Sequence, residues 1–451
     1  MTNIQRVHLM GIGGAGMSAL AKLLKAHGLE VTGCDKCKPH FDLESLQYSI
    51  GHSPEHIGTY KPEALILSSA VNRDNPEVIR AIESGVKILS RAQALSWLFN
   101  NSYGIGIAGA HGKTTTTSMT GLIFMKSNMN PTVYVGANVP DIGNNAVSGE
   151  GKYFVAELDE SDGTFELFHP SIAVITNSDW DHVDHYPTRE AVIEAFTRYA
   201  DGRKENGTLI ICAEDEGASK VYDMCDKSRG RIIRYGWGKS FDWGAYDVKD
   251  THGGGITCRV SHEGHELGVL ELSVSGEHNI MNSLAAIASA HLCGINFDES
   301  SRILKDFHGS ERRMQVKGIT HNNILIMDDY AHHPSEIRAT LKAVRSIYPE
   351  RRLVVLYQPH RFSRTAMFAG DIASALMNAD EVYLLPVYSA GEQELSHSSS
   401  DEIINLSGNR IMPLKFNDAL ETLKLKLKPD DLFLTMGAGD VYIIGEKILS
   451  E

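Results

Sequence analysis

A glycine-rich turn between an apolar run and a threonine-rich segment constrains the fold of this chain more than any other feature. Residues 104–117 read G-I-G-I-A-G-A-H-G-K-T-T-T-T, so a buried-looking strand enters a tight loop and Lys113 opens a helix. Such a loop directs backbone N–H groups, a helix N-terminus and an ammonium group toward one point, which is how proteins hold nucleotide phosphates. The sequence therefore predicts an ATP site.

The spacing of this loop departs from G-x-x-x-x-G-K-[ST], which would place a glycine where the chain has Ile107. A chance G-K-T is an alternative, but the preceding strand and the four threonines favour a phosphate loop. In that interpretation Lys113 contacts the β and γ phosphates and the Thr114 hydroxyl binds magnesium. The other loop residues expected at ATP are Gly109, Ala110, His111, Gly112 and Thr115.

Length and composition set the broad class of the protein. A chain of 451 residues predicts about three domains, and 42% hydrophobic with 22% charged residues is typical of a globular protein. We expect a cytoplasmic protein without membrane insertion, because the sequence shows neither a long apolar run nor a signal-peptide core. The net charge of −14 argues against a nucleic-acid partner.

The six cysteines lack the density of a disulfide scaffold, so reduced thiols are expected. Cys34-x-x-Cys37 with His40 nearby could suggest a zinc or redox site. No second ligand pair follows, and we therefore consider metal binding there the less favoured interpretation.

Short apolar runs alternate with helical patterns along most of the chain, which predicts an α/β fold with three sheets. Polar, turn-prone segments near residues 100–102 and 308–311 suggest domains at 1–102, 103–310 and 311–451. We expect a Rossmann-like N-terminal domain, a central domain with a mixed sheet like that of P-loop ATPases, and a Rossmann-like C-terminal domain. The expected strands include 7–10, 64–67, 105–108, 154–158, 173–176, 324–327, 353–357, 382–385 and 432–434.

The first expected strand leads into a second glycine loop, G-I-G-G-A-G, with Asp35 about 20 residues later at the end of another strand. This pattern fits a dinucleotide or any sugar nucleotide with a pyrophosphate, and a glycine turn without a ligand is the alternative. The residues expected to line this crevice are Gly11, Gly13, Gly14, Gly16, Asp35, Ser68 and Ser69.

Two expected strands of the central segment end in, or are followed by, polar residues that could bind a ligand. Glu157 closes one strand, and His182 follows the next shortly after its end. Because ligands bind beyond the carboxyl ends of parallel strands, Glu157 is a candidate magnesium ligand. His182 is a candidate second metal ligand or a contact to the transferred phosphate. For the neighbouring Asp184 and His185 a solvated loop is preferred.

The C-terminal segment has its own polar cluster after a strand, Q-P-H-R-F-S-R, which contains His360, Arg361 and Arg364. Two arginines and a histidine could hold a small carboxylate. A solvated helix face is the alternative for the arginines.

A series of motifs along nearly the whole length resembles the Mur ligases, ATP-dependent amide-forming enzymes of peptidoglycan precursor synthesis. These motifs are G-I-G-G-A-G-M-S-A-L-A, G-A-H-G-K-T-T-T-T, E-L-D-E-S-D, T-N-x-x-x-D-H, G-E-H-N-I-M-N, an R-R pair, D-D-Y-A-H-H-P, Q-P-H-R-F-S-R and T-M-G-A-G-D. Ala110 stands where many relatives carry threonine, and E-L-D replaces E-A-D. The first lysine after His182 is Lys204, so the carbamoylated lysine of several Mur ligases is absent, as in the alanine-adding branch.

The resemblance implies roles for further residues. Asn279 and Asn282 look like the family's adenine contacts, Arg313 like its γ-phosphate arginine and Asp329 like its ribose aspartate. Lys113, Glu157, His182 and Arg313 would form the catalytic set, with Thr114, Glu157 and His182 as metal ligands. The amino-acid pocket would consist of Tyr330, His360, Arg361 and Arg364.

The implied reaction joins L-alanine to the lactyl carboxylate of UDP-N-acetylmuramate through an acyl phosphate. The resemblance implies ATP with Mg²⁺ or Mn²⁺, and a monomer or homodimer. Within the family, a ligase that attaches a preformed peptide in cell-wall recycling is the alternative. An NAD oxidoreductase would leave Lys113 and Asn279 unexplained, and a noncatalytic nucleotide switch would leave the segment from His360 to Arg364 unexplained.

Overall fold

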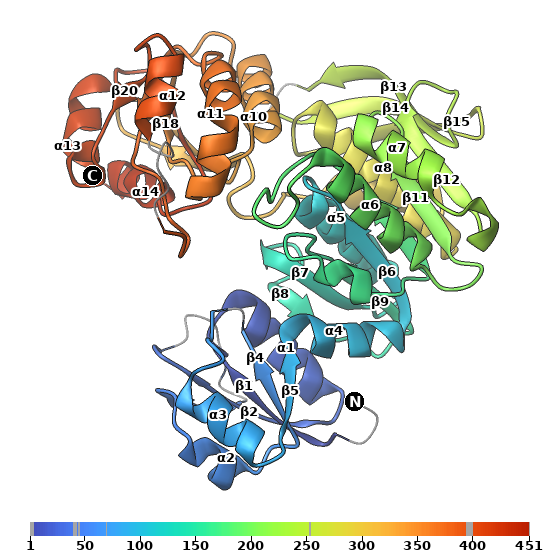
Figure 1. The fold of residues 1–451 in the computed structure, drawn as a ribbon. Helices are drawn as coiled ribbons and strands as arrows, with labels where there is room; N and C mark the ends of the chain where they lie inside the picture. The colour runs from blue at the N-terminus through green and yellow to red at the C-terminus, as the bar shows by residue number, and fades with distance from the viewer. Residues whose placement is uncertain are drawn as a thin grey trace.

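The computed structural model describes residues 4–38, 43, 46–68, 70–251, 254–393 and 400–450, without the side chains of Ala15 and Asn144. Three β-sheets follow one another along the chain, each flanked by helices (Figure 1). The blue N-terminal part and the orange-to-red C-terminal part lie on different sides of the central part. The predicted α/β class with three sheets is confirmed. Among the described residues, no helix combines the length and apolar character that crossing a bilayer requires.

The first sheet consists of five parallel strands in the order β3-β2-β1-β4-β5. The strand order reverses on either side of β1, which places a ligand crevice beyond the ends of β1 and β4. The elements are β1 (Arg6–Met10), β2 (Glu30–Asp35), β3 (Gln47–Ile50), β4 (Ala64–Leu67), β5 (Lys87–Ser90), α1 (Ala15–Ala26), α2 (Glu55–Tyr60), α3 (Pro76–Glu83) and α4 (Arg91–Asn100).

The second sheet is a mixed sheet of ten strands in the order β15-β14-β13-β12-β11-β10-β6-β9-β7-β8. Its strands are β6 (Tyr103–Ala108), β7 (Thr132–Val139), β8 (Asn144–Val147), β9 (Tyr153–Glu157), β10 (Ile172–Ile175), β11 (Thr208–Cys212), β12 (Ile232–Trp237), β13 (Trp243–Asp250), β14 (Ile256–His262) and β15 (His265–Leu272). Its helices are α5 (Lys113–Lys126), η1 (Thr164–Leu167), α6 (Arg189–Asp201), α7 (Glu216–Met224), η2 (Lys227–Arg229), α8 (Glu277–Leu292) and α9 (Phe297–Leu304). The antiparallel pairs β7–β8, β13–β14 and β14–β15 lie at the two edges.

The alternation G-I-G-I in β6 explains how this strand sits between two helical layers. A Cβ atom at Gly104 would lie 2.4 Å from the Phe99 ring, and one at Gly106 would lie 2.7 Å from Leu158. The isoleucines face the other side and are buried in the core cluster that includes residues of α5 and α8. Glycine on one face therefore lets neighbouring side chains approach the backbone, while isoleucine fills the opposite core.

The third sheet has the order β16-β17-β21-β18-β19-β20, with β16 antiparallel to β17 and the other pairs parallel. Its strands are β16 (Gln315–Ile319), β17 (Leu325–Asp329), β18 (Leu353–Tyr357), β19 (Glu381–Leu384), β20 (Met412–Pro413) and β21 (Leu432–Met436). Its helices are α10 (Pro334–Ile347), α11 (Phe362–Leu376), α12 (Ser400–Leu406), α13 (Phe416–Lys426) and α14 (Tyr442–Ser450).

The first two sheets share one hydrophobic core, whereas the third sheet has its own. Phe99 of α4 lies in the shared core, with its ring 5.5 Å from that of Phe154 and 5.4 Å from that of Phe168. The third sheet is packed by separate clusters, which Trp180 and Val183 of the central segment reach from outside. Apolar packing thus joins the first two sheets firmly, while many contacts of the third are polar and surround the candidate site.

Candidate active site

The predicted phosphate loop follows β6 directly and ends at Gly112, the N-cap residue of α5. Gly112 has φ +78°, and a Cβ atom there would lie 2.6 Å from Asn282 Oδ1. Gly109 has φ +149°, and its Cβ position would overlap the Thr176 hydroxyl. Glycine is required at both positions because the backbone is left-handed and its neighbours approach closely. The loop therefore exposes the N-terminus of α5 as an anion site.

The Lys113 ammonium is held beneath this loop by a buried carboxylate. Its Nζ lies 2.8 Å from Glu160 Oε2 and donates to the Gly109 carbonyl at 2.6 Å. Burial alone would lower the pKa of Lys113, but the charges of Glu160, Asp159 and Glu157 together outweigh burial and raise it, so the ammonium stays protonated. Sequence reasoning missed Glu160, although it lies in the E-L-D-E-S-D motif, three residues after Glu157.

The three candidate metal ligands lie around the same loop. Thr114 Oγ1 donates to Glu157 Oε1 at 2.9 Å, and the Gly136 N–H donates to Glu157 Oε2 at 2.7 Å. Burial raises the pKa of Glu157, against the charge of Lys113 and these donors. His182 Nε2 lies 3.3 Å from Glu160 Oε1, and no described residue hydrogen-bonds its buried Nδ1. This set of oxygen donors with one free ring nitrogen fits Mg²⁺ or Mn²⁺.

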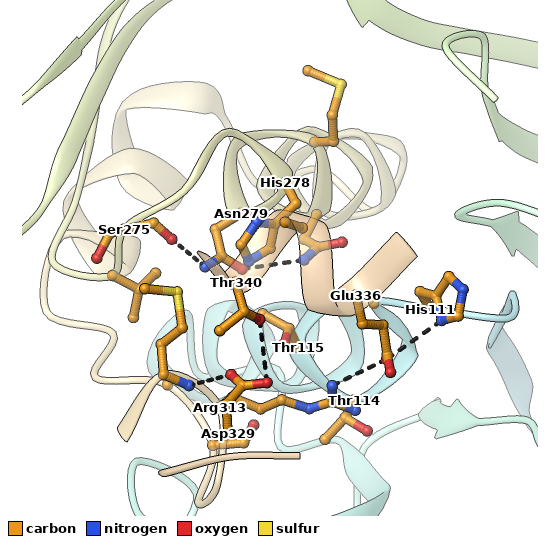
Figure 2. Close-up of a pocket in the computed structure, with 18 of the residues that line it drawn as sticks. His111, Thr114, Thr115, Ser275, His278, Asn279, Arg313, Asp329, Glu336 and Thr340 are labelled. Atoms are coloured by element: carbon orange, nitrogen blue, oxygen red, sulfur yellow. Dashed lines mark hydrogen bonds and ion pairs between the residues drawn. The ribbon is translucent and has the colours of Figure 1, made fainter. Parts of the chain in front are cut away.

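A cavity of about 680 Å³ brings the phosphate loop, helix α8 and the third sheet together (Figure 2). Eight of the residues expected at ATP line it: His111, Gly112, Thr114, Thr115, Asn279, Asn282, Arg313 and Asp329. The other three expected residues, Gly109, Ala110 and Lys113, do not line the cavity. The carbonyls of Gly109 and Ala110 accept hydrogen bonds from the Lys113 ammonium. Residues that are more than 200 positions apart in the sequence thus enclose one space.

The candidate adenine and ribose residues are held by hydrogen bonds within the lining. Asn282 accepts a hydrogen bond from Thr116 and donates one to Asn279, which donates to the Ser275 carbonyl. Asp329 accepts backbone N–H groups of Met314 and Ala331 and the Thr340 hydroxyl. Burial raises the pKa of Asp329 to about 6, despite the opposing charge of Arg313.

Glu336 of α10 connects the phosphate loop to the third sheet. One of its oxygens lies 3.3 Å from His111 Nδ1 and 3.3 Å from Arg313 Nη1, and Figure 2 shows the carboxylate between these two cations. His111 Nε2 also lies 3.4 Å from Asp179. Burial would lower the pKa of His111, but Glu336 and Asp179 raise it to about 10, so the ring is an imidazolium. Sequence reasoning missed Glu336 and Asp179, which no spacing pattern linked to His111.

The residues predicted to bind the amino acid do not line this cavity. They lie at and near the start of α11 and in a row of aromatic side chains. Arg364 is 4% exposed, and its guanidinium binds Asp181 of the central segment with two hydrogen bonds of 2.9 Å. Arg361 Nη1 lies 3.2 Å from Asp184, so this exposed loop residue has a partner. His360 stacks on Tyr388 with ring centroids 5.6 Å apart. The carboxylate clamp is therefore already occupied by acidic side chains of the central segment.

Tyr330 connects this row to the cavity. Its ring lies 5.3 Å from the guanidinium of Arg313 and 5.5 Å from the His332 ring, which lies 5.9 Å from His360. The candidate amino-acid and γ-phosphate residues are therefore neighbours.

The N-terminal glycine loop lies in the crevice of the first sheet. A Cβ atom at Gly11, which has φ +80°, would lie 2.8 Å from Ser68 Cβ, and the Gly13 N–H donates to Asp35 Oδ2 at 2.8 Å. Gly14 N donates to the Gly11 carbonyl at 3.2 Å. The predicted residue Ser69 lies outside the described part of the chain.

Gly16 connects this loop to the central sheet. Tyr134 of β7 donates to the Gly16 carbonyl at 3.5 Å, and a Cβ atom at Gly16 would lie 2.3 Å from Arg91 Nη1. Strand β7 continues to Gly136, the donor to Glu157. Sequence reasoning missed Arg91 and Tyr134, whose side chains both lie next to Gly16 of the N-terminal glycine loop.

Comparison with protein families gives matches to three domain models along the chain. The Mur ligase family, catalytic domain, matches residues 6–103; the Mur ligase middle domain matches residues 107–290; and the Mur ligase, glutamate ligase domain, matches residues 312–439. Together the three models span most of the chain.

Similar proteins include two UDP-N-acetylmuramate–L-alanine ligases. That of Saccharopolyspora erythraea is 40% identical, and the match covers 99% of this chain and 93% of the relative. That of Desulforamulus reducens is 38% identical, and the match covers 99% of this chain and 97% of the relative. The crystal structure of UDP-N-acetylmuramate–alanine ligase from Thermotoga maritima matches with a TM-score of 0.80 and 28% identity, covering 99% of this chain and 98% of the other. A murein peptide ligase of Psychrobacter arcticus shares the fold, with a TM-score of 0.73, 24% identity and coverage of 99% and 98%.

Proposed function

The chain belongs to the Mur ligase family, and we propose that it joins L-alanine to the lactyl carboxylate of UDP-N-acetylmuramate with consumption of ATP. The reaction forms an amide bond in peptidoglycan precursor synthesis. The observation that carries this function is the full-length similarity, at 38% and 40% identity, to ligases with that name. The cavity between the phosphate loop and the third sheet is proposed to hold the reacting groups.

ATP is proposed to occupy this cavity. Its phosphates lie on the loop of residues 109–115, where the N-terminus of α5 and the His111 imidazolium attract negative charge. The adenine contacts Asn279 and Asn282, and the ribose hydroxyls contact Asp329. Arg313 approaches the γ-phosphate from the third sheet.

The divalent cation is proposed to bind Thr114, Glu157 and His182. Bound magnesium, or manganese, would neutralise charge on the β and γ phosphates. The oxygens of Thr114 and Glu157 are already hydrogen-bonded to each other, and His182 has a left-handed backbone with φ +51°.

The sugar nucleotide is proposed to bind the first sheet. The loop with Gly11, Gly13, Gly14 and Gly16, which leads into the N-terminus of α1, receives the diphosphate, with Ser68 beside it. Asp35 faces the uridine end. Arg91 lies next to Gly16 and supplies a cation for the diphosphate. Strand β7 runs from Tyr134, which contacts Gly16, to Gly136, which contacts Glu157. The lactyl carboxylate of a sugar nucleotide bound at Gly16 is therefore proposed to point toward the phosphate loop.

L-Alanine is proposed to bind near Tyr330, His360, Arg361 and Arg364. Arg364 Nη1 donates to the His360 carbonyl at 3.2 Å while its other nitrogens bind Asp181. Because Asp181 occupies Nε and Nη2, the amino acid's carboxylate is proposed to approach the Nη1 side of this guanidinium, whose orientation is fixed by the protein.

The chemistry rests on charge neutralisation and positioning. The γ-phosphoryl group passes from ATP to the lactyl carboxylate, and the resulting acyl phosphate is attacked by the alanine amine, which releases phosphate. Lys113, His111 and Arg313 stabilise negative charge on the moving phosphoryl group. Because an acyl phosphate hydrolyses in water, the third sheet and its helices must cover the site during turnover.

The functional units follow the three sheets. We propose a sugar-nucleotide domain at residues 1–102, an ATP-binding domain at 103–310 and an amino-acid-binding domain at 311–451, in line with the three matched segments. A cytoplasmic location fits ATP consumption and the six free cysteines, all within the described residues.

A direct assay distinguishes this function from its rivals. Purified protein receives ATP, Mg²⁺ and UDP-N-acetylmuramate, with either L-alanine or a preformed tripeptide, and phosphate and the ligated product are measured. We expect both products with L-alanine and neither when the sugar nucleotide is omitted. Product with the tripeptide alone would identify the peptide-adding ligase instead.

A further inference from the structure

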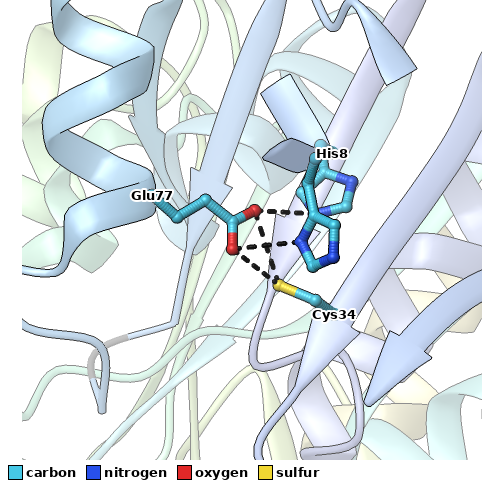
Figure 3. A group of neighbouring side chains, drawn as sticks. His8, Cys34 and Glu77 are labelled. Atoms are coloured by element: carbon cyan, nitrogen blue, oxygen red, sulfur yellow. Dashed lines mark hydrogen bonds and ion pairs between the residues drawn. The ribbon is translucent and has the colours of Figure 1, made fainter. Parts of the chain in front are cut away.

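A second group of polar side chains is buried in the first sheet, away from the phosphate loop. His8 of β1, Cys34 of β2, His56 of α2 and Glu77 of α3 each offer one ligand atom, and all four atoms lie within 4.8 Å of one another. His8, Cys34 and Glu77 are fully buried. Figure 3 shows the Glu77 carboxylate facing His8 and the Cys34 sulfur.

The short distances from Glu77 to the other members of this group are close to those between ligands of one metal ion. Glu77 Oε1 lies 3.1 Å from His8 Nε2, and Glu77 Oε2 lies 3.2 Å from His56 Nδ1. Cys34 Sγ lies 3.4 and 3.6 Å from the two carboxylate oxygens. Ligands bound tetrahedrally to zinc at about 2.0–2.3 Å are separated by roughly 3.3–3.8 Å.

A hydrogen bond to Thr32 orients the His8 ring toward Glu77. His8 Nδ1 lies 2.8 Å from Thr32 Oγ1, and this hydroxyl donates its own proton to the Val7 carbonyl. This contact fixes the ring with Nε2 toward Glu77.

His8 Nε2 lies 3.1 Å from Glu77 Oε1 in the buried interior, yet among the residues that the structure describes no group meets this nitrogen with hydrogen-bond geometry. A cation bound between the two groups would satisfy both. The contact from Nδ1 to Thr32 is the kind of outer interaction that orients a metal-bound histidine. His52 Nδ1, 3.1 Å from Cys34 Sγ, can in turn donate to a bound thiolate.

We propose that His8, Cys34, His56 and Glu77 bind one zinc ion as a structural site of the first sheet. The thiolate and carboxylate balance the two positive charges of the ion, and four protein ligands leave no open position for catalysis. A sulfur ligand selects zinc over magnesium. Cys37, the other cysteine of the C-x-x-C pattern, is exposed and outside the group.

The site also explains a link to the glycine loop. The Cys34 carbonyl accepts the N–H groups of Gly11 at 2.8 Å and Ile12 at 3.2 Å. A metal ion on Cys34 would therefore fix the residue that shapes the loop proposed for the sugar diphosphate.

Metal replacement tests the proposal on the full-length protein. The purified protein is stripped with a strong chelator and titrated with Co²⁺, whose bond to a thiolate gives a charge-transfer absorption in the near ultraviolet. We expect this band to saturate at about one Co²⁺ per chain, to disappear in Cys34→Ser and to persist in Cys37→Ser, the matched exposed control. Zinc added in equimolar amount should abolish the band and raise the Tm of the stripped protein.

Glu77→Gln provides a second variant and should weaken Co²⁺ binding at least tenfold while keeping the sulfur ligand. Absence of the band in the stripped wild-type protein would overturn the proposal without reference to any variant. A band that survives in Cys34→Ser would assign the metal to another thiol and would also overturn it.

Discussion

The guanidinium of Arg364 binds the carboxylate of Asp181 across the boundary between the second and third sheets. Nε donates to Oδ1 and Nη2 to Oδ2, each at 2.9 Å, and both residues are 4% exposed. Burial would raise the pKa of Asp181, but the charge and hydrogen bonds of Arg364, with contributions from neighbouring histidines, together hold that pKa well below its usual range. This ion pair fixes α11 against the central segment and orients the group proposed to bind the alanine carboxylate.

Removing this arginine should affect both substrate binding and stability. Arg364→Ala is expected to raise the apparent KM for L-alanine more than that for ATP. It should also lower the free energy of unfolding by about 3–5 kcal/mol, because Asp181 is left buried without its partner. Steady-state kinetics and urea unfolding measure the two effects.

Two variants separate these effects. Arg361→Ala removes the exposed partner of Asp184 and should change stability by less than about 1 kcal/mol. Adding Asp181→Asn to Arg364→Ala should recover stability without restoring the KM for L-alanine. Recovery of both would assign Arg364 a purely structural role.

Loss of Lys113 should stop turnover. Lys113→Ala removes the buried ammonium beneath the phosphate loop, and we expect kcat to fall by at least about 100- to 1000-fold while the far-ultraviolet circular dichroism spectrum is retained. Lys126→Ala, on the exposed end of the same helix, is the control and should keep normal kcat. Near-normal phosphate release by Lys113→Ala would refute the assignment of the ATP site.

The pKa of His111 predicts how stability changes in alkaline solution. The pKa is 6.5 for an ordinary histidine and about 10 in the fold, so between these values the folded state holds one more proton than the unfolded state. The stabilisation is complete below pH 6.5 and is lost as the pH rises toward 10, by up to about 1.4 kcal/mol per pH unit.

Urea unfolding of wild-type protein and His111→Gln over this range isolates the effect, because other titrating groups are common to both. The difference in unfolding free energy should shrink as the pH rises. A difference that does not change with pH would show that His111 is not an imidazolium in the fold.

Arg91 should act on the sugar nucleotide alone. Arg91→Ala removes the cation beside Gly16, and we expect the KM for UDP-N-acetylmuramate to rise about tenfold with little change in the KM for ATP. Arg80→Ala, which removes an exposed arginine of α3, serves as the control. An equal rise in both KM values would argue against a specific role at the diphosphate.

The fold was predictable from the sequence where local pattern and tertiary environment agree. Strands 64–67 and 353–357 match β4 and β18 at both ends, and strand 7–10 matches β1 except that β1 begins one residue earlier, at Arg6, since each apolar run is buried and bounded by polar turns. Strand β3 was not expected because Gln47–Ile50 has intermediate or exposed residues throughout and lies at a sheet edge.

Among the site residues, only those that belong to sequence motifs could be predicted from the sequence. Lys113, Glu157 and Arg313 belong to recognisable patterns, but their partners Glu160 and Glu336 were not anticipated. The contact of Glu336 with His111 joins residues more than 200 positions apart and depends on how α10 packs against the phosphate loop. Likewise, no spacing links His8 to Cys34, His56 and Glu77, which the parallel sheet and its helices bring together.

The fate of the carboxylate oxygen tests the central claim most directly. UDP-N-acetylmuramate labelled with oxygen-18 in its lactyl carboxylate is incubated with the protein, ATP, Mg²⁺ and L-alanine, and the released phosphate is analysed by mass spectrometry. Transfer of the γ-phosphoryl group to the carboxylate predicts one labelled oxygen in the phosphate for each amide bond formed. Amide product accompanied by unlabelled phosphate would contradict the acyl-phosphate account.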